Sequence, residues 1–580
     1  MPNPFHVDES RPWFTSEAGW PDEVPKNMEF PEKTLGEFLK ESVVKWPDQP
    51  AIWFLDTWVT YRELDDLVDR FATGLHRAGV QKGDVVAALL PNSIQYVVAY
   101  YACARLGAIL SGVNPTYKPG EILHQLETVH AKVLIVLDAL YEPSVAPIRE
   151  QAPFRLVIAS NIADLALSPL KRFLGRLLKK IPTGPVPPDA LRFKDLCRTP
   201  PDVPKVEIDV RTHPATYIMT GGTTGVPKAA VLSHFNCVSN ALQSAAWLYK
   251  AQPGACDVGV LPLFHSFAHT CVMNISIACG CWMMLFPKPP PTDELIRRIE
   301  TLAPPEGALY PGAEILFQKL AEFPGIENRD LSRLTLCVSG AGPLHRPVQE
   351  AFERNTGGKL SEGYGLTEAT PVVCAGPFWG NRKIGTIGLP FPGTEWRIAD
   401  PTDPTRTLPP GPEHPGELLV AGPQVMVGYL DQPEATAETI VEMDGKRWLR
   451  TGDIGWMDEQ GRVTISDRLK QLIKHKGFSV YPKEVEEYVG THEGVLEVAV
   501  AGLPDVEAGE RIKAWVVLRP EWKGKLTEEA LLEWCRANMT KYKVPSWIEF
   551  RDELPKSLVG KVLRRTLQEA DPLWKAAHPE

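Results

Sequence analysis

The sequence predicts a protein of mixed α/β class with one large and one small domain. Short apolar runs alternate with helical patterns from Leu35 to Leu137, which is typical of parallel βαβ units. After "GRVTISDR" the pattern restarts with elements for a small α+β unit of about 110 residues. We therefore expect domains at residues 1–469 and 470–580, with their boundary at Asp467 to Lys470.

The elements of the large domain can be followed along the chain. The runs "VVAALL" and "VLIVL" predict strands, and "YRELDDLVDRFATGLHRAG" predicts a helix that ends at Gly79. The uncharged run from Thr270 to Pro287 is about long enough to span a bilayer. It contains Asn274 and Gly280 and lies between two motifs assigned to one site below, so we interpret it as buried strands. Proline-rich surface loops are expected at Pro182 to Pro188, Pro287 to Pro291 and Asp400 to Pro415.

The small domain is expected from three runs that follow the boundary. They are "YPKEVEEYVG", "LEVAVAGL" and "IKAWVVLRP", and together they are compact enough for an α+β unit.

Composition excludes several classes of protein. Hydrophobic residues make up 44% and charged residues 23% of the 580 residues, which excludes a largely disordered chain. The net charge of -10 argues against nucleic acid as a main partner, because no basic excess exists to neutralise phosphates. Ten cysteines without metal-ligand spacing indicate free thiols in a reducing cytoplasm. The N-terminal "MPNPFHVDESRPWFTSE" does not predict a signal peptide.

The stretch "TGGTTGVPK" has the composition of a phosphate-binding loop. A nucleotide-triphosphatase loop needs Gly before its Lys and Ser or Thr after it, whereas Pro227 and Ala229 flank Lys228. The glycines allow positive φ and bring backbone N–H groups close to an anion. An ordinary turn is the alternative interpretation. The residues that would contact phosphate are Thr220, Gly221, Gly222, Thr223, Thr224, Gly225 and Lys228.

The segment Leu170 to Ile181 is amphipathic. Its apolar face is formed by Leu170, Phe173, Leu174, Leu177, Leu178 and Ile181, and its basic face by Lys171, Arg172, Arg176, Lys179 and Lys180. This pattern is typical of a helix at a membrane surface, and equally of a helix packed on the protein with a solvated basic face. Both interpretations stay open.

Seven motifs, in order, resemble the ANL superfamily of adenylate-forming enzymes and, within it, bacterial long-chain fatty-acid CoA ligases. The resemblance covers about Thr34 to Leu567 and rests on "TGGTTGVPK", "LPLFHSFAHT", "SEGYGLTEATP", "GELLVAGPQVMVGYL", "RTGDIGW", "DRLKQLIKHKGFSVYPKEVE" and "LPKSLVGKVLRR". It implies that a fatty acid and ATP form an acyl-adenylate, which CoA converts to acyl-CoA with release of AMP and pyrophosphate. It also implies a β-barrel-like portion in the large domain, a mobile small domain, and Mg²⁺ as cofactor.

The resemblance assigns a nucleotide site within the large domain. It implies that Tyr364 stacks on adenine, Thr367 touches the α-phosphate, and Asp453 and Arg468 contact the ribose. Thr223 and Glu368 would hold Mg²⁺, which prefers oxygen ligands. Residues of the segments "SGAGPL" and "SEGYG" would border adenine: Gly340, Ala341, Gly363 and Gly365. From the residues alone, each part of this site has an alternative interpretation. "YGLTE" could be a surface turn, "SGAGPL" a strand–loop junction, and Asp453 with Arg468 a solvated ion pair.

The remaining roles are also carried over from the family. His265 would gate or orient the acyl end of the site, although a lone His among apolar residues is more often part of the core; His269 receives no role. Lys561 would enter the site for the first half-reaction, and an exposed basic turn is its alternative. Lys474 and Gly477 would bind CoA. Lys470 would be the hinge.

Other functions remain as rivals. A ligase for aromatic or medium-chain acids is the nearest one, and a membrane fatty-acid transporter or a lipid-binding protein belongs to a different class. We expect a cytoplasmic enzyme, with peripheral contact at the inner face of the membrane through Leu170 to Ile181 and a homodimer as open alternatives.

Overall fold

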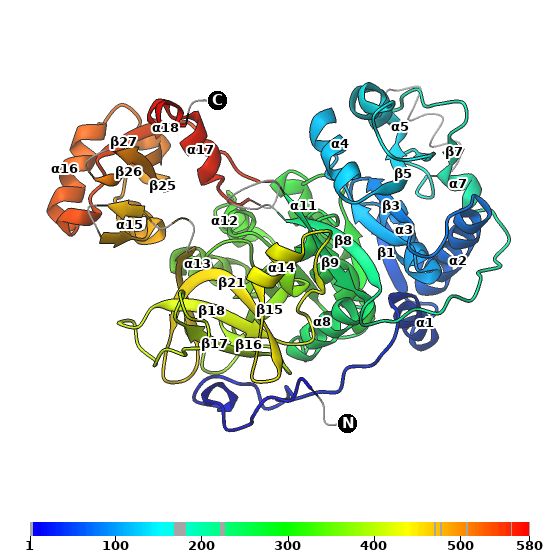
Figure 1. The fold of residues 1–580 in the computed structure, drawn as a ribbon, viewed down its shortest axis with the longest axis horizontal. Helices are drawn as coiled ribbons and strands as arrows, with labels where there is room; N and C mark the ends of the chain where they lie inside the picture. Colours follow the sequence, from blue (N-terminus) through cyan, green and yellow to red (C-terminus); the bar gives the residue numbers. More distant parts are fainter. Residues whose placement is uncertain are drawn as a thin grey trace. The chain divides into compact units, whose positions relative to one another are not determined.

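The computed structural model describes residues 4–167, 181–220, 227–468, 471, 473–475, 478–505, 508–557 and 560–578 (Figure 1). The chain forms two compact units. One comprises Met1–Gly222, Val226–Trp396 and Val420–Leu449; the other comprises Thr223–Gly225, Arg397–Leu419 and Arg450–Glu580.

A nine-stranded sheet forms one layer of the first unit. Its order is β16-β15-β14-β13-β12-β10-β11-β1-β2. The pairs from β1 through β14 are parallel, apart from β1–β2, and β15 and β16 pair antiparallel at the other edge. The strands are β1 Pro50–Phe54, β2 Thr57–Thr60, β10 Cys256–Gly259, β11 Trp282–Leu285, β12 Ala308–Gly312, β13 Leu334–Ser339, β14 Lys359–Gly365, β15 Val372–Ala375 and β16 Leu389–Pro390.

An eight-stranded sheet forms a second layer, with order β19-β9-β8-β4-β3-β5-β6-β7. The expected strands "VVAALL" and "VLIVL" are β3 and β5, and their parallel pairing confirms the βαβ prediction. The strands are β3 Val85–Leu89, β4 Ile109–Gly112, β5 Ala131–Leu137, β6 Leu156–Ser160, β7 Leu191–Arg192, β8 Pro214–Thr220, β9 Lys228–Ser233 and β19 Gly428–Tyr429.

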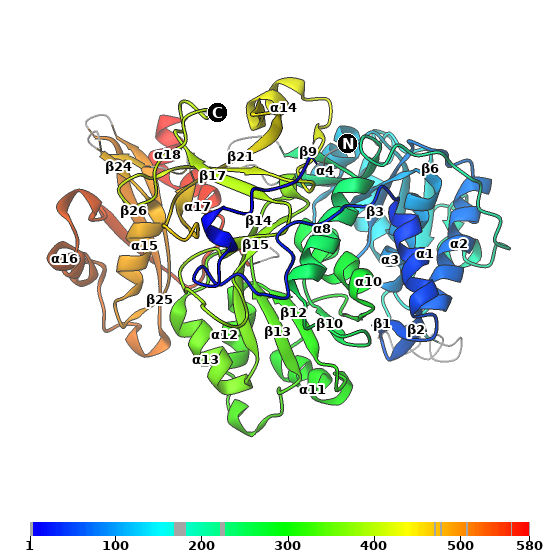
Figure 2. The ribbon, with the colours of Figure 1, turned by 90° about the horizontal axis from the view of Figure 1, so that it is seen from below.

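Most residues of helices α3 (Ile94–Leu106) and α8 (His234–Trp247) are buried, and both helices pack on the eight-stranded sheet. Helix α8 follows β9 directly, and its Asn240 Nδ2 donates to the Val372 carbonyl of β15 at 2.8 Å. Figure 2 shows α8 and α10 (Ile275–Cys279) beside α1 (Leu35–Lys45) and α3. Capping boxes at Thr34–Glu37 and Thr60–Glu63 start α1 and α2 (Tyr61–Arg77).

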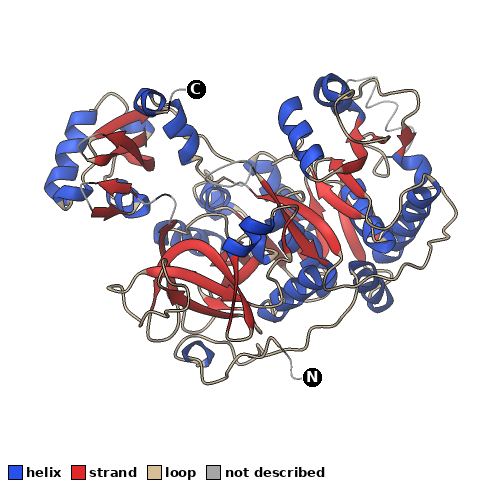
Figure 3. Cartoon of the chain, viewed as in Figure 1, coloured by secondary structure: helices blue, strands red, loops and turns tan. Residues whose placement is uncertain are grey.

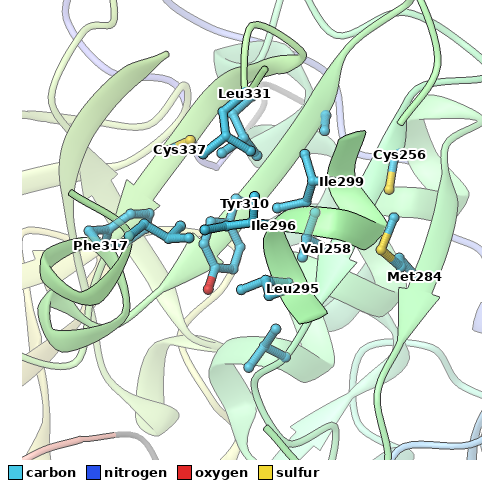
Figure 4. Packing of buried hydrophobic residues seen from close by; sticks show 14 of the residues in the cluster. Cys256, Val258, Met284, Leu295, Ile296, Ile299, Tyr310, Phe317, Leu331 and Cys337 are labelled. Carbon is cyan, nitrogen blue, oxygen red and sulfur yellow. The ribbon is translucent and has the colours of Figure 1, made fainter. Parts of the chain in front are cut away.

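The outer face of the nine-stranded sheet is covered by α11 (Thr292–Leu302), α12 (Glu314–Ala321) and α13 (Arg346–Thr356). Figure 4 shows Leu295, Ile296 and Ile299 of α11 against Val258 and Tyr310 of the sheet. The helix α4 (Pro119–Thr128) packs on the eight-stranded sheet. The short helices of this unit are η1 Pro12–Phe14, α5 Asp138–Leu140, η2 Tyr141–Val145, η3 Ala146–Ile148, α7 Phe193–Leu196, α9 Ser266–Ala268, η4 His269–Asn274, η5 Ile326–Asn328, η6 Thr367–Ala369 and α14 Pro433–Thr439.

The expected barrel-like portion is a five-stranded sheet of order β17-β18-β21-β20, with β22 paired to β21 (Figure 3). Its strands are β17 Glu395–Ala399, β18 Gly416–Ala421, β20 Ile440–Met443, β21 Lys446–Met457 and β22 Val463–Arg468.

The C-terminal part is α+β, as predicted. Its strands have the order β24-β23-β26-β25, with β27 paired to β26, and "YPKEVEEYVG" forms a helix. The elements are β23 Ile473–His475, β24 Phe478–Val480, α15 Pro482–Gly490, β25 Val495–Asp505, β26 Gly509–Leu518, η8 Pro520–Trp522, α16 Glu528–Asn538, η9 Lys541–Lys543, β27 Trp547–Arg551, α17 Arg564–Ala570 and α18 Pro572–Ala577.

The interpretation of Thr270 to Pro287 as buried strands is wrong for its first half. Residues His269–Asn274 form a π-helical turn that continues into α10, and only Trp282–Leu285 form a strand. The run is uncharged and almost wholly buried, so it carries no clear period that distinguishes a buried helix from a buried strand. None of the described helices is long and apolar enough to cross a membrane. The segment Leu170 to Ile181 lies outside the described residues except for Ile181.

Candidate active site

The phosphate-loop candidate joins the two strands of a hairpin. Strands β8 and β9 are antiparallel, and Thr220 at the end of β8 is directly opposite Lys228 at the start of β9. A triphosphatase loop leads from a strand into a helix, whereas this one leads from a strand into a strand. The sequence argument from Pro227 against that class is therefore supported. The loop residues Gly221, Gly222, Thr223, Thr224 and Gly225 lie outside the described residues.

Lys228 and Glu368 are linked through one tyrosine. The Lys228 ammonium lies 5.0 Å from the ring centroid of Tyr429, and the Tyr429 hydroxyl donates to Glu368 Oε1 at 2.7 Å. Tyr429 belongs to β19, which pairs with β9 and so extends the loop-bearing sheet by one short strand. The structure thus brings together two residues that are 140 positions apart in the sequence (228 and 368).

The backbone that carries Glu368 is fixed on both sides. Thr370 has a φ of 64°, an uncommon conformation for a β-branched residue. It is held there by two bonds: Thr270 Oγ1 donates to its carbonyl at 2.8 Å, and its own hydroxyl donates to the Gln424 carbonyl at 2.7 Å. Met426 N also donates to the Glu368 carbonyl at 2.9 Å. Such over-determined strain is typical of functional sites, and here it fixes the position of Glu368.

Thr367 is hydrogen-bonded to Ser266, the residue that follows His265 in the chain. The hydroxyls of Thr367 and Ser266 are 3.0 Å apart. His265 caps the short helix α9, since its Nδ1 accepts from Phe267 N at 3.2 Å. Nδ1 of His265 is therefore the acceptor in this bond. The four predicted residues Lys228, Glu368, Thr367 and His265 therefore belong to one set of contacts.

His269, to which the sequence assigns no role, is fully buried one turn after His265. Neither of its ring nitrogens has a hydrogen-bond partner in the part of the chain that the structure describes. Burial lowers the pKa of His269 to about 3, so the ring is neutral. Its edge-to-face contact with Tyr100, at 4.6 Å between centroids, indicates a core residue.

The segments expected to border adenine differ in how closely they are packed. Gly340 follows β13, and a Cβ there would lie 2.9 Å from the ring of Phe267. Ala341 is exposed and has a φ of 67°. In β14, Tyr364 is opposite Cys374 and half-buried. Its neighbours Gly363 and Gly365 leave no room for a side chain, since a Cβ would meet Val338 and the Pro371 carbonyl.

Asp453 lies in the second unit, on β21, and is 3% exposed. The backbone before it is held by Glu417, a buried residue of β18. Glu417 accepts from Gly452 N at 3.0 Å and from Arg450 Nη2 at 2.6 Å. Arg468 is opposite Asp453 in the β21–β22 ladder, so the two residues assigned to the ribose are cross-strand neighbours.

Two of the C-terminal candidates, Lys474 and Lys561, belong to the described residues of the α+β part. Lys474 lies on β23, and its backbone N donates to Glu510 Oε2 at 2.7 Å. Lys561 closes a tight turn in which Ser557 N donates to the Lys561 carbonyl at 2.8 Å and Lys556 pairs with Val562. Gly477 and Lys470 lie outside the described residues.

Sequence reasoning missed three residues of these contacts: Tyr429, Ser266 and Glu417. All three stand inside motifs already singled out, in "VGYL", "HSF" and "GEL". Their position in a motif was the available signal. Their contact partners could not be predicted from the sequence, because each contact joins elements that are distant along the chain.

Comparison with known proteins identifies the family. Residues 39–430 match the AMP-binding enzyme family, and residues 484–561 match the AMP-binding enzyme C-terminal domain. A long-chain-fatty-acid–CoA ligase of Bacillus subtilis (strain 168) is 39% identical over 574 residues, covering 97% of this chain and 99% of that protein. The 4-coumarate–CoA ligase 2 of Oryza sativa subsp. japonica is 34% identical over 546 residues, covering 92% of each chain.

Solved structures share the fold. ATP-bound MatB from Rhodopseudomonas palustris is similar with a TM-score of 0.78 at 27% identity, covering 93% of this chain and 100% of that one. A long-chain-fatty-acid-CoA ligase (FadD1) from Archaeoglobus fulgidus is similar with a TM-score of 0.66 at 26% identity, covering 90% of this chain and 98% of that one.

Proposed function

The chain belongs to the AMP-binding enzyme family, and we propose that it is a long-chain fatty-acid–CoA ligase. In the first half-reaction a carboxylate oxygen of the fatty acid attacks the α-phosphorus of ATP and the bond to pyrophosphate breaks. In the second, the CoA thiolate attacks the acyl carbonyl and the bond to AMP breaks. The observation that carries this proposal is the nearly full-length similarity to a bacterial fatty-acid–CoA ligase.

The hairpin geometry supports cleavage at the α-phosphate. A loop between two strands can hold the β- and γ-phosphates as they leave together, and Lys228 at its base provides a positive charge. We propose that Thr220, Thr223, Thr224 and Lys228 contact the triphosphate, with the glycines between them close to it. Adenine would lie against Tyr364 and the segments that contain Gly340, Ala341, Gly363 and Gly365. Thr367 would contact the α-phosphate, and Asp453 and Arg468 the ribose.

The donor set fits Mg²⁺ as the cofactor. Glu368 offers a carboxylate, Thr223 offers a hydroxyl, and hard cations prefer such oxygen ligands. Bound to the nucleotide, Mg²⁺ supplies positive charge against the phosphate oxygens. Since Glu368 Oε1 is already bonded to Tyr429, we propose Oε2 as the oxygen that faces the cation.

The two half-reactions need different groups. Two anions meet in the first one, and Lys561 would offset their repulsion; a positioned charge of this kind is worth about 3 kcal/mol, or about a hundredfold in rate. Lys474 and Gly477 would bind CoA in the second. We propose that residues 470–580 form a mobile domain that turns at Lys470 on residues 1–469, and that His265 gates the acyl end.

The proposal is tested by chromatography of the nucleotide products with acids of graded chain length, with and without CoA. Fatty-acid-dependent AMP is expected, and fatty-acid-dependent ADP would contradict it. Similarity to the rice 4-coumarate–CoA ligase keeps an aromatic acid as a second candidate; higher kcat/KM with 4-coumarate than with every fatty acid would favour it.

Location and assembly are further proposals. A cytoplasmic enzyme that contacts the inner face of the membrane through the basic residues of Leu170 to Ile181 is expected to bind anionic liposomes. Charge reversal of these residues should abolish flotation with the liposomes. A homodimer would be detected by light scattering.

A further inference from the structure

Tyr429 has a fixed position between two residues of the proposed site. It is opposite Ala230 in the β19–β9 pairing, and Lys228 stands two residues before Ala230 in the same strand. Residues two apart on a strand project from the same face, so Lys228 is the diagonal cross-strand neighbour of Tyr429. The sheet register therefore places the ammonium over the ring, at 5.0 Å from its centroid.

The tyrosine is also held by its surroundings. Its backbone N donates to Thr436 Oγ1 at 2.9 Å, and the next residue, Leu430, donates its N to the Ala229 carbonyl at 2.9 Å. These bonds fix the strand on both sides of the side chain. The backbone from which the ring projects towards Glu368 is therefore held in place.

The hydrogen bond to Glu368 has one direction only. An ionised carboxylate accepts and cannot donate, so the Tyr429 hydroxyl is the donor across the 2.7 Å contact. For the second oxygen, Glu368 Oε2, no partner is found among the described residues.

We propose that Tyr429 is a positioning residue for the magnesium–nucleotide complex: its hydroxyl fixes Glu368 Oε1 so that Oε2 faces the cation, while its ring supports the Lys228 ammonium. This inference rests on the proposed function. A carboxylate free to rotate would have to be ordered when the cation binds, and the tyrosine removes that cost in advance. The cation–π contact does the same for the long lysine side chain.

The test separates the hydroxyl from the ring by measuring ATP binding to the full chain by calorimetry, once in EDTA and once in Mg²⁺. The ratio of the two dissociation constants is the magnesium increment. Tyr429→Phe keeps the ring and removes the donor, so we expect an increment at least fivefold smaller, with binding in EDTA within twofold of wild type. Tyr429→Leu removes both, so binding in EDTA should also weaken at least threefold; Tyr429→Met replaces it if the leucine variant does not fold.

Tyr249→Phe is the matched control, since Tyr249 packs on Trp379 in another part of the same unit. It should leave both constants unchanged. A Tyr429→Phe increment within twofold of wild type would overturn the role of the hydroxyl, and unchanged EDTA binding in the leucine or methionine variant would overturn that of the ring. If the wild-type chain forms no fatty-acid-dependent AMP, the proposed function fails; normal AMP formation with an unchanged increment contradicts the tyrosine alone.

Discussion

Replacing Glu417 by alanine should loosen the strand that carries Asp453. The Glu417 side chain is 3% exposed and that of its partner Arg450 is 25% exposed, so this ion pair is largely screened from water. Glu417 also accepts the N–H of Gly452, the residue immediately before Asp453. Removing one partner of such a buried pair leaves the other charge uncompensated, which typically costs about 3–5 kcal/mol. Glu417→Gln keeps the volume and one acceptor, so a smaller loss is expected.

Hydrogen exchange followed by mass spectrometry measures this loss locally, in peptides from β21. A destabilisation of about 3 kcal/mol corresponds to about a hundredfold faster exchange of amides that open in the same unit. The Kd for ATP should rise together with the exchange rate, since the residue proposed to hold the ribose moves with the strand. Arg406→Ala is the control: Arg406 is 69% exposed beside Asp400, and exposed pairs contribute about 0–1 kcal/mol. Exchange in β21 within threefold of wild type in Glu417→Ala would refute the argument.

Three further predictions concern other parts of the chain. Lys561→Ala should lower acyl-adenylate formation about a hundredfold but spare conversion of supplied acyl-adenylate by CoA; equal loss of both steps in half-reaction assays would contradict its role. Arg564→Ala should destabilise the C-terminal part by about 3 kcal/mol in urea unfolding, because the side chains of Arg564 and its partner Glu486 are only 19% and 14% exposed. Arg565→Ala is the control, since the Arg565 side chain is 50% exposed in its ion pair. It should change the free energy of unfolding by less than about 1 kcal/mol. Burial lowers the pKa of His269 to about 3 from 6.5, so the stability that the neutral ring allows is present above pH 6.5 and is lost as the pH falls towards 3. His269→Leu should therefore move the midpoint of acid unfolding to lower pH. An unchanged midpoint would contradict this.

The sequence predicted the parallel βαβ layers and the α+β character of the C-terminal part, because strand and helix periods are local signals. The same reasoning failed for residues 270–279, which form a helical segment whose residues are mostly buried. Period identifies an element only if one of its faces meets water. A helix without such a face has a residue composition that resembles that of a buried strand.

The candidate site divides in the same way. The sequence by itself determined the types of chemical groups, since Lys228, Glu368, Thr367 and Asp453 stand in short motifs of recognisable composition. Only the tertiary structure decided which groups touch: Tyr429 between Lys228 and Glu368, and Ser266 beside Thr367. Sheet order and register decide these contacts, because β19 joins β9 about 200 residues after it in the chain. Pairing between distant strands depends on how whole layers pack, and no local stretch of sequence specifies it.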